Sequence, residues 1–176
     1  MIDLKQDYFA LFGLVPAFSI DMERLEQAYI DIQARVHPDR FAHLSDTEKR
    51  LSMQWATHAN EAFRTLKSPL TRGHYLLELR GVDPGFDTNT AMAPDFLMEQ
   101  MEWREALGEA TDAADEDALD ELSRRLRQGT RALEAELARQ LDETADLEGA
   151  ADSVRRMKFL EKLQHEINDA LTALES

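Results

Sequence analysis

The chain has 176 residues, a formal net charge of -15 and no cysteine. The lack of cysteine excludes disulfides, thiolate zinc sites, all-cysteine iron-sulfur sites and thiol nucleophiles. The acidic balance argues against nucleic acid and anionic membranes as partners, because both are bound through basic surfaces. Neither a basic leader-like start nor a run of about 18 apolar residues is found, so we expect a soluble, cytoplasmic protein.

The charge is divided unevenly along the chain. Residues 1–78 contain 11 acidic and 9 basic residues, whereas residues 79–176 contain 24 acidic and 11 basic residues. Hydrophobic residues make up 43% of the chain, which is enough to form a core. The contrast in charge predicts two modules with different partners.

The first part of the chain shows helical periodicity and no strand-like alternation, which predicts an all-α fold. A short aromatic helix is expected over residues 7–14. A second helix is expected to begin after Asp21, a good N-cap, and to end near His37, because Pro38 disfavours helical geometry in the residue before it. Its apolar face is predicted from steps of three and four residues, at Met22, Leu25, Tyr29, Ile32 and Val36.

The loop after His37 leads into a second long helix. Ser45 and Glu48 have the spacing of a capping box, which predicts a helix start at that point. Two long helices joined by a short polar loop pack as an antiparallel hairpin, with the loop exposed at its tip. Ser68 and Pro69 then predict the start of a further helix, which we expect to end near Gly81.

The second part of the chain is predicted to form a three-helix bundle. Residues 81–94 are expected to be a linker between a module over residues 1–80 and a module over residues 95–176. Helical patterns cover residues 95–108, 115–141 and 150–174, and short loops join them. On the first of these helices, Phe96, Trp103 and Leu107 share one side, whereas Leu97, Met98 and Met101 face another side. The residues alone leave open whether this second side packs against a neighbouring module or is an exposed docking surface.

The tripeptide His37-Pro38-Asp39 between two amphipathic helices resembles the J-domain, the module that couples DnaK-like ATPases to their clients. The similarity extends to the segments on either side of the hairpin loop, residues 7–14 (DYFALFGL) and residues 60–66 (NEAFRTL).

Three further segments narrow the resemblance to one kind of J-protein. Residues 69–77, 96–105 and 152–160 are similar to signatures of the HscB family, the J-domain co-chaperones of iron-sulfur cluster assembly. The similarity spans nearly the whole chain and is weakest over residues 111–144. It implies an N-terminal J-domain helical hairpin, a C-terminal three-helix bundle, no enzymatic activity of the chain itself, and neither a cofactor nor a metal ion.

The resemblance also implies two partners and the residues that meet them. One partner is a DnaK-like, HscA-type chaperone, whose ATPase the J-domain stimulates, and the other is an iron-sulfur cluster scaffold protein, which the bundle carries. The residues expected to bind the chaperone are His37, Pro38, Asp39, Arg40, Arg24 and Arg35. The residues expected to bind the scaffold are Leu97, Met98, Met101, Glu102, Glu105 and Phe159.

The chain departs from the family pattern near the loop. Arg40 stands where a lysine is usual, which keeps the charge and changes its geometry. The helix before the loop has only Arg24 and Arg35 as basic residues, although J-domains commonly have a basic face there. Steering toward the chaperone can therefore depend more on Arg40, Lys49 and Arg50.

Two alternatives are weighed against this hypothesis. A general J-protein that serves unfolded chains would usually contain a glycine- and phenylalanine-rich segment and a cysteine-rich zinc module, and the sequence has neither. A small metal-dependent hydrolase could use His37, Asp39 and His43, but a metal site needs three or four converging ligands and supporting groups around them. Metal content and activity of the isolated protein would distinguish this class from an adaptor.

Overall fold

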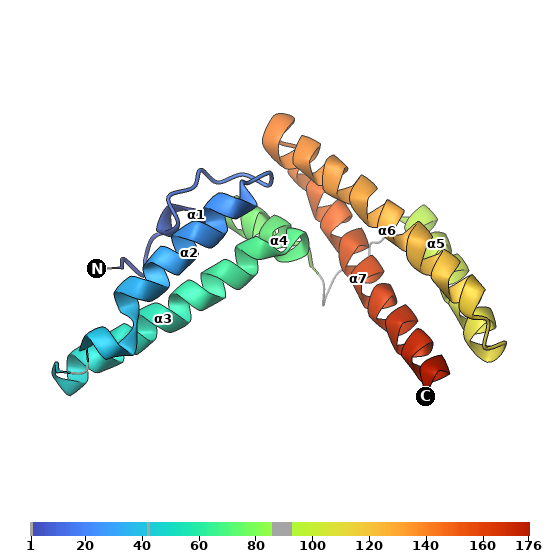
Figure 1. Ribbon diagram of the computed structural model, residues 1–176. Coiled ribbons are helices and arrows are strands. Elements are labelled where there is room, and N and C mark those ends of the chain that lie inside the picture. The colour runs from blue at the N-terminus through green and yellow to red at the C-terminus, as the bar shows by residue number, and fades with distance from the viewer. Residues whose placement is uncertain (1, 42, 86–92) are drawn as a thin grey trace. The chain divides into compact units, whose positions relative to one another are not determined.

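The computed structural model describes residues 2–41, 43–85 and 93–176, and their regular structure consists entirely of helices. The chain divides into two compact units, Met1–Leu79 and Arg80–Ser176, each described separately below (Figure 1). The prediction of an all-α protein is confirmed. Part of the predicted linker, residues 86–92, lies outside the described residues.

The first unit begins with the short helix α1 (Tyr8–Leu11), which Asp7 caps by accepting a hydrogen bond from the Ala10 N–H. This helix is shorter than the predicted span of residues 7–14, because the backbone turns at Gly13, whose φ is +68°. Phe9 is fully buried, and the ring of Tyr8 stacks on Tyr75 with 4.5 Å between centroids. The aromatic residues of α1 therefore contribute to the core, as the sequence predicts.

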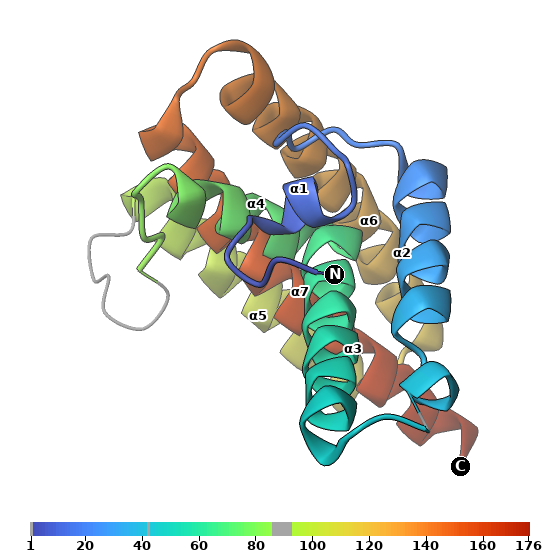
Figure 2. The same cartoon turned by 90° about the vertical axis from the view of Figure 1, so that its left-hand side faces the viewer.

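Two long helices, α2 (Met22–Val36) and α3 (Asp46–Lys67), lie side by side in both views of the first unit (Figures 1 and 2). Asp21 caps α2, and Ser45 with Glu48 forms the predicted capping box of α3. Tyr29 of α2 stacks on Phe63 of α3 with 4.2 Å between ring centroids. These contacts confirm the antiparallel hairpin. The loop that connects α2 to α3 therefore lies at one end of the hairpin.

Helix α4 (Pro69–Leu79) completes the first unit. It begins at Pro69, as predicted, and buries Leu76 and Leu77. Arg72 is also buried, with 7% of its surface exposed, and its guanidinium donates to the carbonyl oxygens of Phe18 and Leu66. This arginine joins α4 to the loop before α2 and to the end of α3.

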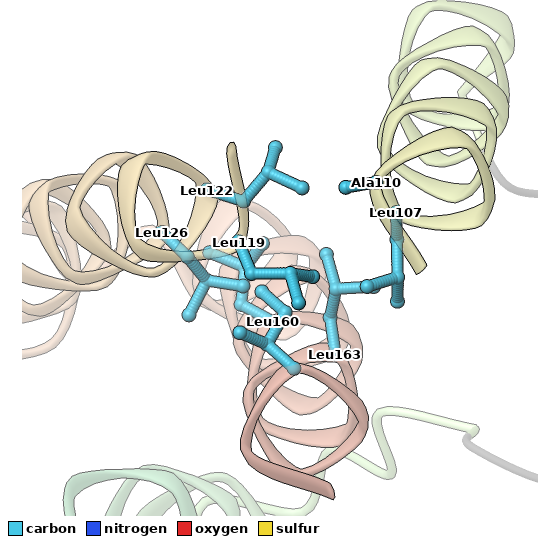
Figure 3. Packing of buried hydrophobic residues seen from close by; sticks show 8 residues of the cluster. Leu107, Ala110, Leu119, Leu122, Leu126, Leu160 and Leu163 are labelled. Atoms are coloured by element: carbon cyan, nitrogen blue, oxygen red, sulfur yellow. The ribbon is translucent and has the colours of Figure 1, made fainter. Parts of the chain in front are cut away.

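The second unit contains α5 (Pro94–Asp112), α6 (Glu116–Ala138) and α7 (Leu147–Glu175). Figure 3 shows side chains of all three helices converging on one core, which confirms the predicted bundle. The buried residues of this core are Leu107, Ala110, Leu119, Leu122, Leu126, Leu160, Leu163 and Ile167. Helix α6 is followed by a π-helical turn, η2 (Arg139–Glu143), in which buried Gln140 accepts a hydrogen bond from the Ser153 hydroxyl.

Residues at the start of the second unit are held against the bundle by two arginines. Arg80 donates to the carbonyl oxygen of Leu141 at 2.8 Å, and Arg155 donates to the carbonyl oxygen of Pro84 at 2.9 Å. Pro84 is itself buried. The segment of residues 80–85, which we call the tethered segment, is thus part of the second unit.

Candidate functional sites

The loop between α2 and α3 contains the tripeptide that the sequence analysis singled out. Helix α2 ends at Val36, and a short 3-10 helix, η1 (Pro38–Phe41), follows His37. The side chain of His37 is 59% exposed and that of Asp39 is 91% exposed. Both groups are therefore available to a partner.

His37 connects α2 to η1 through its backbone and its ring. Its φ of -57° and ψ of 134° take the chain out of α2, and its carbonyl oxygen accepts from the Arg40 N–H at 3.0 Å. The Asp39 N–H donates to Nδ1 of the His37 ring, with 3.2 Å between the nitrogens. Since Pro38 has no N–H, the amide of Asp39 is the first one in η1 that a capping group can bind.

A residue that the sequence analysis did not identify supports the base of this loop. Ser52 of α3 is 1% exposed, and its hydroxyl donates to the carbonyl oxygen of Val36 at 2.7 Å. That carbonyl belongs to the last turn of α2, where it has no partner within the helix. Little in the sequence indicates that Ser52 would be buried, because Leu51 is the residue that fits the apolar spacing of α3. In the structure, however, Leu51 is 36% exposed.

The basic residues expected to bind the chaperone do not all lie near the loop. Arg35 and Arg40 are exposed on either side of His37. Arg24 lies 13 residues before His37 in the sequence, which corresponds to roughly 20 Å along a helix. Its guanidinium donates to the carbonyl oxygen of Gly13 at 3.2 Å, so it also holds the segment before α2.

Helix α5 presents the apolar side that the sequence left unassigned. Leu97, Met98 and Met101 are 45%, 63% and 71% exposed, and we call these three residues the α5 patch. On the other side of the helix, Phe96 and Leu107 are buried, and Trp103 packs partly buried against the core. The predicted separation of two faces is confirmed, and within the second unit the α5 patch is exposed surface.

Acidic residues adjoin the α5 patch. Glu102 and Glu105 are exposed one and four residues after Met101 on the same helix. In the part of the chain that the structure describes, neither of them forms an ion pair, whereas Glu99 lies 3.4 Å from the guanidinium of Arg156. The patch therefore combines apolar side chains with available negative charge, which suits a partner surface that is apolar and basic.

Phe159 of α7 differs from the α5 patch in its burial. It is partly buried against the bundle core, and its ring meets the edge of Phe96 with 5.9 Å between centroids. The guanidinium of Arg104 lies 5.5 Å from the centre of the Phe159 ring and pairs with Glu166. Phe159 thus contributes to packing and still reaches the surface, so its assignment to scaffold binding stays a prediction.

Arg156 of α7 contacts side chains at the start of α5. Its guanidinium lies over the Phe96 ring at 4.8 Å and contacts the carboxylates of Asp95 and Asp152. Burial alone would lower the pKa of Arg156, but the hydrogen bond to Asp152 and the charge of Asp95 outweigh it and raise the pKa. Sequence reasoning missed this residue because its partners on α5 are about 60 positions away.

The metal-dependent alternative would need several ligand side chains that converge on one point. Among the described residues no group of three or more histidine, cysteine, aspartate or glutamate side chains is arranged to hold a metal ion. No described helix has the length and apolar character needed to cross a membrane.

Comparison with known proteins gives a consistent result over the full length. Residues 92–168 match a family model described as the HSCB C-terminal oligomerisation domain. A co-chaperone protein HscB homolog from Azoarcus sp. (strain BH72) is 61% identical over 175 residues, 99% of each chain. Chaperone HscB from Vibrio cholerae has a TM-score of 0.85 at 38% identity, covering 96% of this chain and 99% of that one. Human co-chaperone protein HscB has a TM-score of 0.88 at 32% identity, covering 94% of this chain and 82% of that one.

Proposed function

Because this chain belongs to the HscB family of co-chaperones, with an N-terminal J-domain and a C-terminal helical bundle, we propose a specific adaptor function for it. The protein delivers an iron-sulfur cluster scaffold protein to a DnaK-like, HscA-type chaperone and stimulates the ATPase of that chaperone, in the cytoplasm. The observation that carries the proposal is the presence of two exposed sites, the His37 loop and the α5 patch, on separate compact units.

The His37 loop is the proposed contact with the chaperone. Its imidazole and carboxylate extend from a loop that is bonded at both ends, by the Ser52 hydroxyl at the end of α2 and by the capping box at the start of α3. Arg35 and Arg40 add positive charge on either side. Stimulation of an ATPase by such a contact requires that the loop bind one conformational state of the chaperone more tightly than another.

The α5 patch with Glu102, Glu105 and Phe159 is the proposed contact with the scaffold. Exposed methionine side chains adapt their shape to a partner, and a cluster of exposed apolar groups rimmed by charge is typical of interaction surfaces. Glu102 and Glu105 would then select basic groups on the scaffold. The strongly acidic second unit, with 24 acidic and 11 basic residues over residues 80–176, favours the same choice of partner.

A steady-state ATPase assay of the HscA-type chaperone tests the proposal. We expect this protein alone to accelerate ATP turnover, and the protein with the scaffold to accelerate it further than either component does. An unfolded model polypeptide in place of the scaffold serves as the control for a general J-protein. Equal acceleration by the polypeptide and the scaffold would contradict a dedicated scaffold function, and no acceleration at all would contradict the assignment of the loop.

A further inference from the structure

The His37 ring uses one nitrogen inside the loop and leaves the other for a partner. Nδ1 accepts the Asp39 N–H at 3.2 Å, in the position of an N-cap for η1. Histidine is an uncommon cap, but its Nδ1 is two bonds from Cβ, as is the side-chain oxygen of asparagine, the usual capping atom. In the described part of the chain, no hydrogen bond involves Nε2 of His37.

Two contacts of Nδ1 imply opposite protonation states. The Asp39 N–H points at Nδ1, which requires a lone pair on that nitrogen, whereas the Asp39 carboxylate oxygen Oδ2 lies 3.6 Å from Nδ1 and would favour a proton there. The first contact decides the matter, because 3.6 Å exceeds the length of a hydrogen bond and the carboxylate is 91% exposed to water. A proton on Nδ1 would face the proton of the amide.

We infer that His37 docks as a neutral imidazole, with Nδ1 as the cap of η1 and Nε2–H as the donor offered to the chaperone. The chaperone group that meets it is consequently a hydrogen-bond acceptor, a carboxylate or a main-chain carbonyl oxygen. This inference rests on the proposed function for its partner, while the state of the free ring does not depend on it.

The free ring is tested by NMR of protein with 15N-labelled histidine, at about pH 8, above the ordinary titration range of imidazole. We expect Nδ1 of His37 to be an unprotonated acceptor with Nε2 carrying the proton, and the Asp39 amide to be protected from exchange. His43, which is exposed in the same loop, provides the signal of an unconstrained ring. The protection should persist in His37→Asn, which keeps a capping oxygen, and disappear in His37→Ala. A proton on Nδ1, or equal exchange in both variants, would overturn the capping role.

The donor is tested by replacing His37 with Nε2-methylhistidine, which blocks the Nε2–H and keeps Nδ1 free to accept. We expect stimulation of the chaperone ATPase to fall about tenfold or more, as when one hydrogen bond to a charged partner is lost, with unchanged helical content. The same replacement at His43 is the matched control and should keep full stimulation. Full stimulation by the protein methylated at position 37 would overturn the donor role. If the unmodified protein fails to stimulate, the proposed function fails, and the NMR result still decides the state of the ring.

Discussion

Arg72 is buried, although arginine side chains usually lie on the protein surface. It is buried beneath α4, where Nε donates to the Phe18 carbonyl at 2.6 Å and a terminal nitrogen donates to the Leu66 carbonyl at 2.7 Å. Its guanidinium also lies 4.8 Å from the centre of the Phe18 ring. These two carbonyl oxygens belong to the loop before α2 and to the last turn of α3. The planar fork of arginine satisfies both at once, which a lysine cannot do.

Replacing Arg72 by methionine should therefore destabilise the first unit. We expect a loss of roughly 2 to 4 kcal/mol in the free energy of unfolding, because two buried carbonyl oxygens lose their donors. Arg72→Lys should recover less than half of this loss. Urea unfolding followed by circular dichroism measures both variants, with Arg64→Met on the exposed side of α3 as the control, for which we expect a change within about 0.5 kcal/mol. Equal effects at positions 64 and 72 would refute the bonding role.

Variants of His37 and Asp39 in the loop should lose function and keep their stability, in contrast to variants of Arg72. His37→Gln and Asp39→Asn are each expected to abolish stimulation of the chaperone ATPase while the melting temperature stays nearly unchanged, because both side chains are exposed. The measurement is the ATPase assay together with a thermal melt of each variant. A large loss of fold would mean that the loop is structural, and the proposed contact with the chaperone would have to lie elsewhere.

At the scale of the helices, the sequence predicts starts and buried faces well, because caps and apolar spacing are local signals. Asp21 and the Ser45 with Glu48 capping box mark helix starts, and the two faces of α5 were separated by spacing alone. Contacts between distant segments were not predicted. Ser52 at the base of the loop and Arg156 beneath α5 are recognisable only when residues remote in sequence are brought together.

The α5 patch gives a test that separates binding from packing. Replacing Leu97, Met98 and Met101 together by alanine should weaken scaffold binding by several kcal/mol, since interface anchors of this type contribute roughly 1 to 3 kcal/mol each. Because the three side chains are largely exposed, stability should change much less. Isothermal titration calorimetry with the scaffold and a urea melt measure the two quantities.

Two further variants calibrate this result. Leu107→Ala in the core should cost about 2 to 5 kcal/mol of folding free energy. Phe159→Ala should lower both stability and scaffold binding, because its ring packs on Phe96 as well as reaching the surface. If the triple variant unfolds as Leu107→Ala does, or if it binds the scaffold normally, the patch is not the docking surface.

At the scale of the whole molecule, the tethered segment places the start of the second unit at residue 80, before the predicted linker. The sequence suggests a linker over residues 81–94, but residues 80–85 are bonded to the bundle through Arg80 and Arg155. We expect a fragment of residues 80–176 to be more stable than one of residues 95–176, by about 1 to 3 kcal/mol for two lost hydrogen bonds from charged donors. Urea melts of the two fragments test this, and equal stabilities would show that the tether contributes nothing.

The charged side chains of the His37 loop and the largely apolar α5 patch should respond differently to salt. Raising the salt concentration to about 0.5 M screens exposed charges, so it should weaken the contact of the His37 loop with the chaperone more than the largely apolar contact of the α5 patch with the scaffold. Affinities for each partner measured over a salt series give the comparison. A stronger salt dependence for the scaffold would mean that Glu102, Glu105 and their neighbours dominate that interface.

The division of the chain at Leu79 has a consequence for its synthesis. Each unit is one uninterrupted stretch of sequence, so no contact inside the first unit waits for residues made after position 79. Helical hairpins with contacts between near neighbours in sequence form rapidly, and N-terminal domains fold first as a chain leaves the ribosome. The first unit can therefore complete its core while the acidic bundle is still being translated, and a ribosome stalled late in the message would display a folded J-domain with its His37 loop already capped.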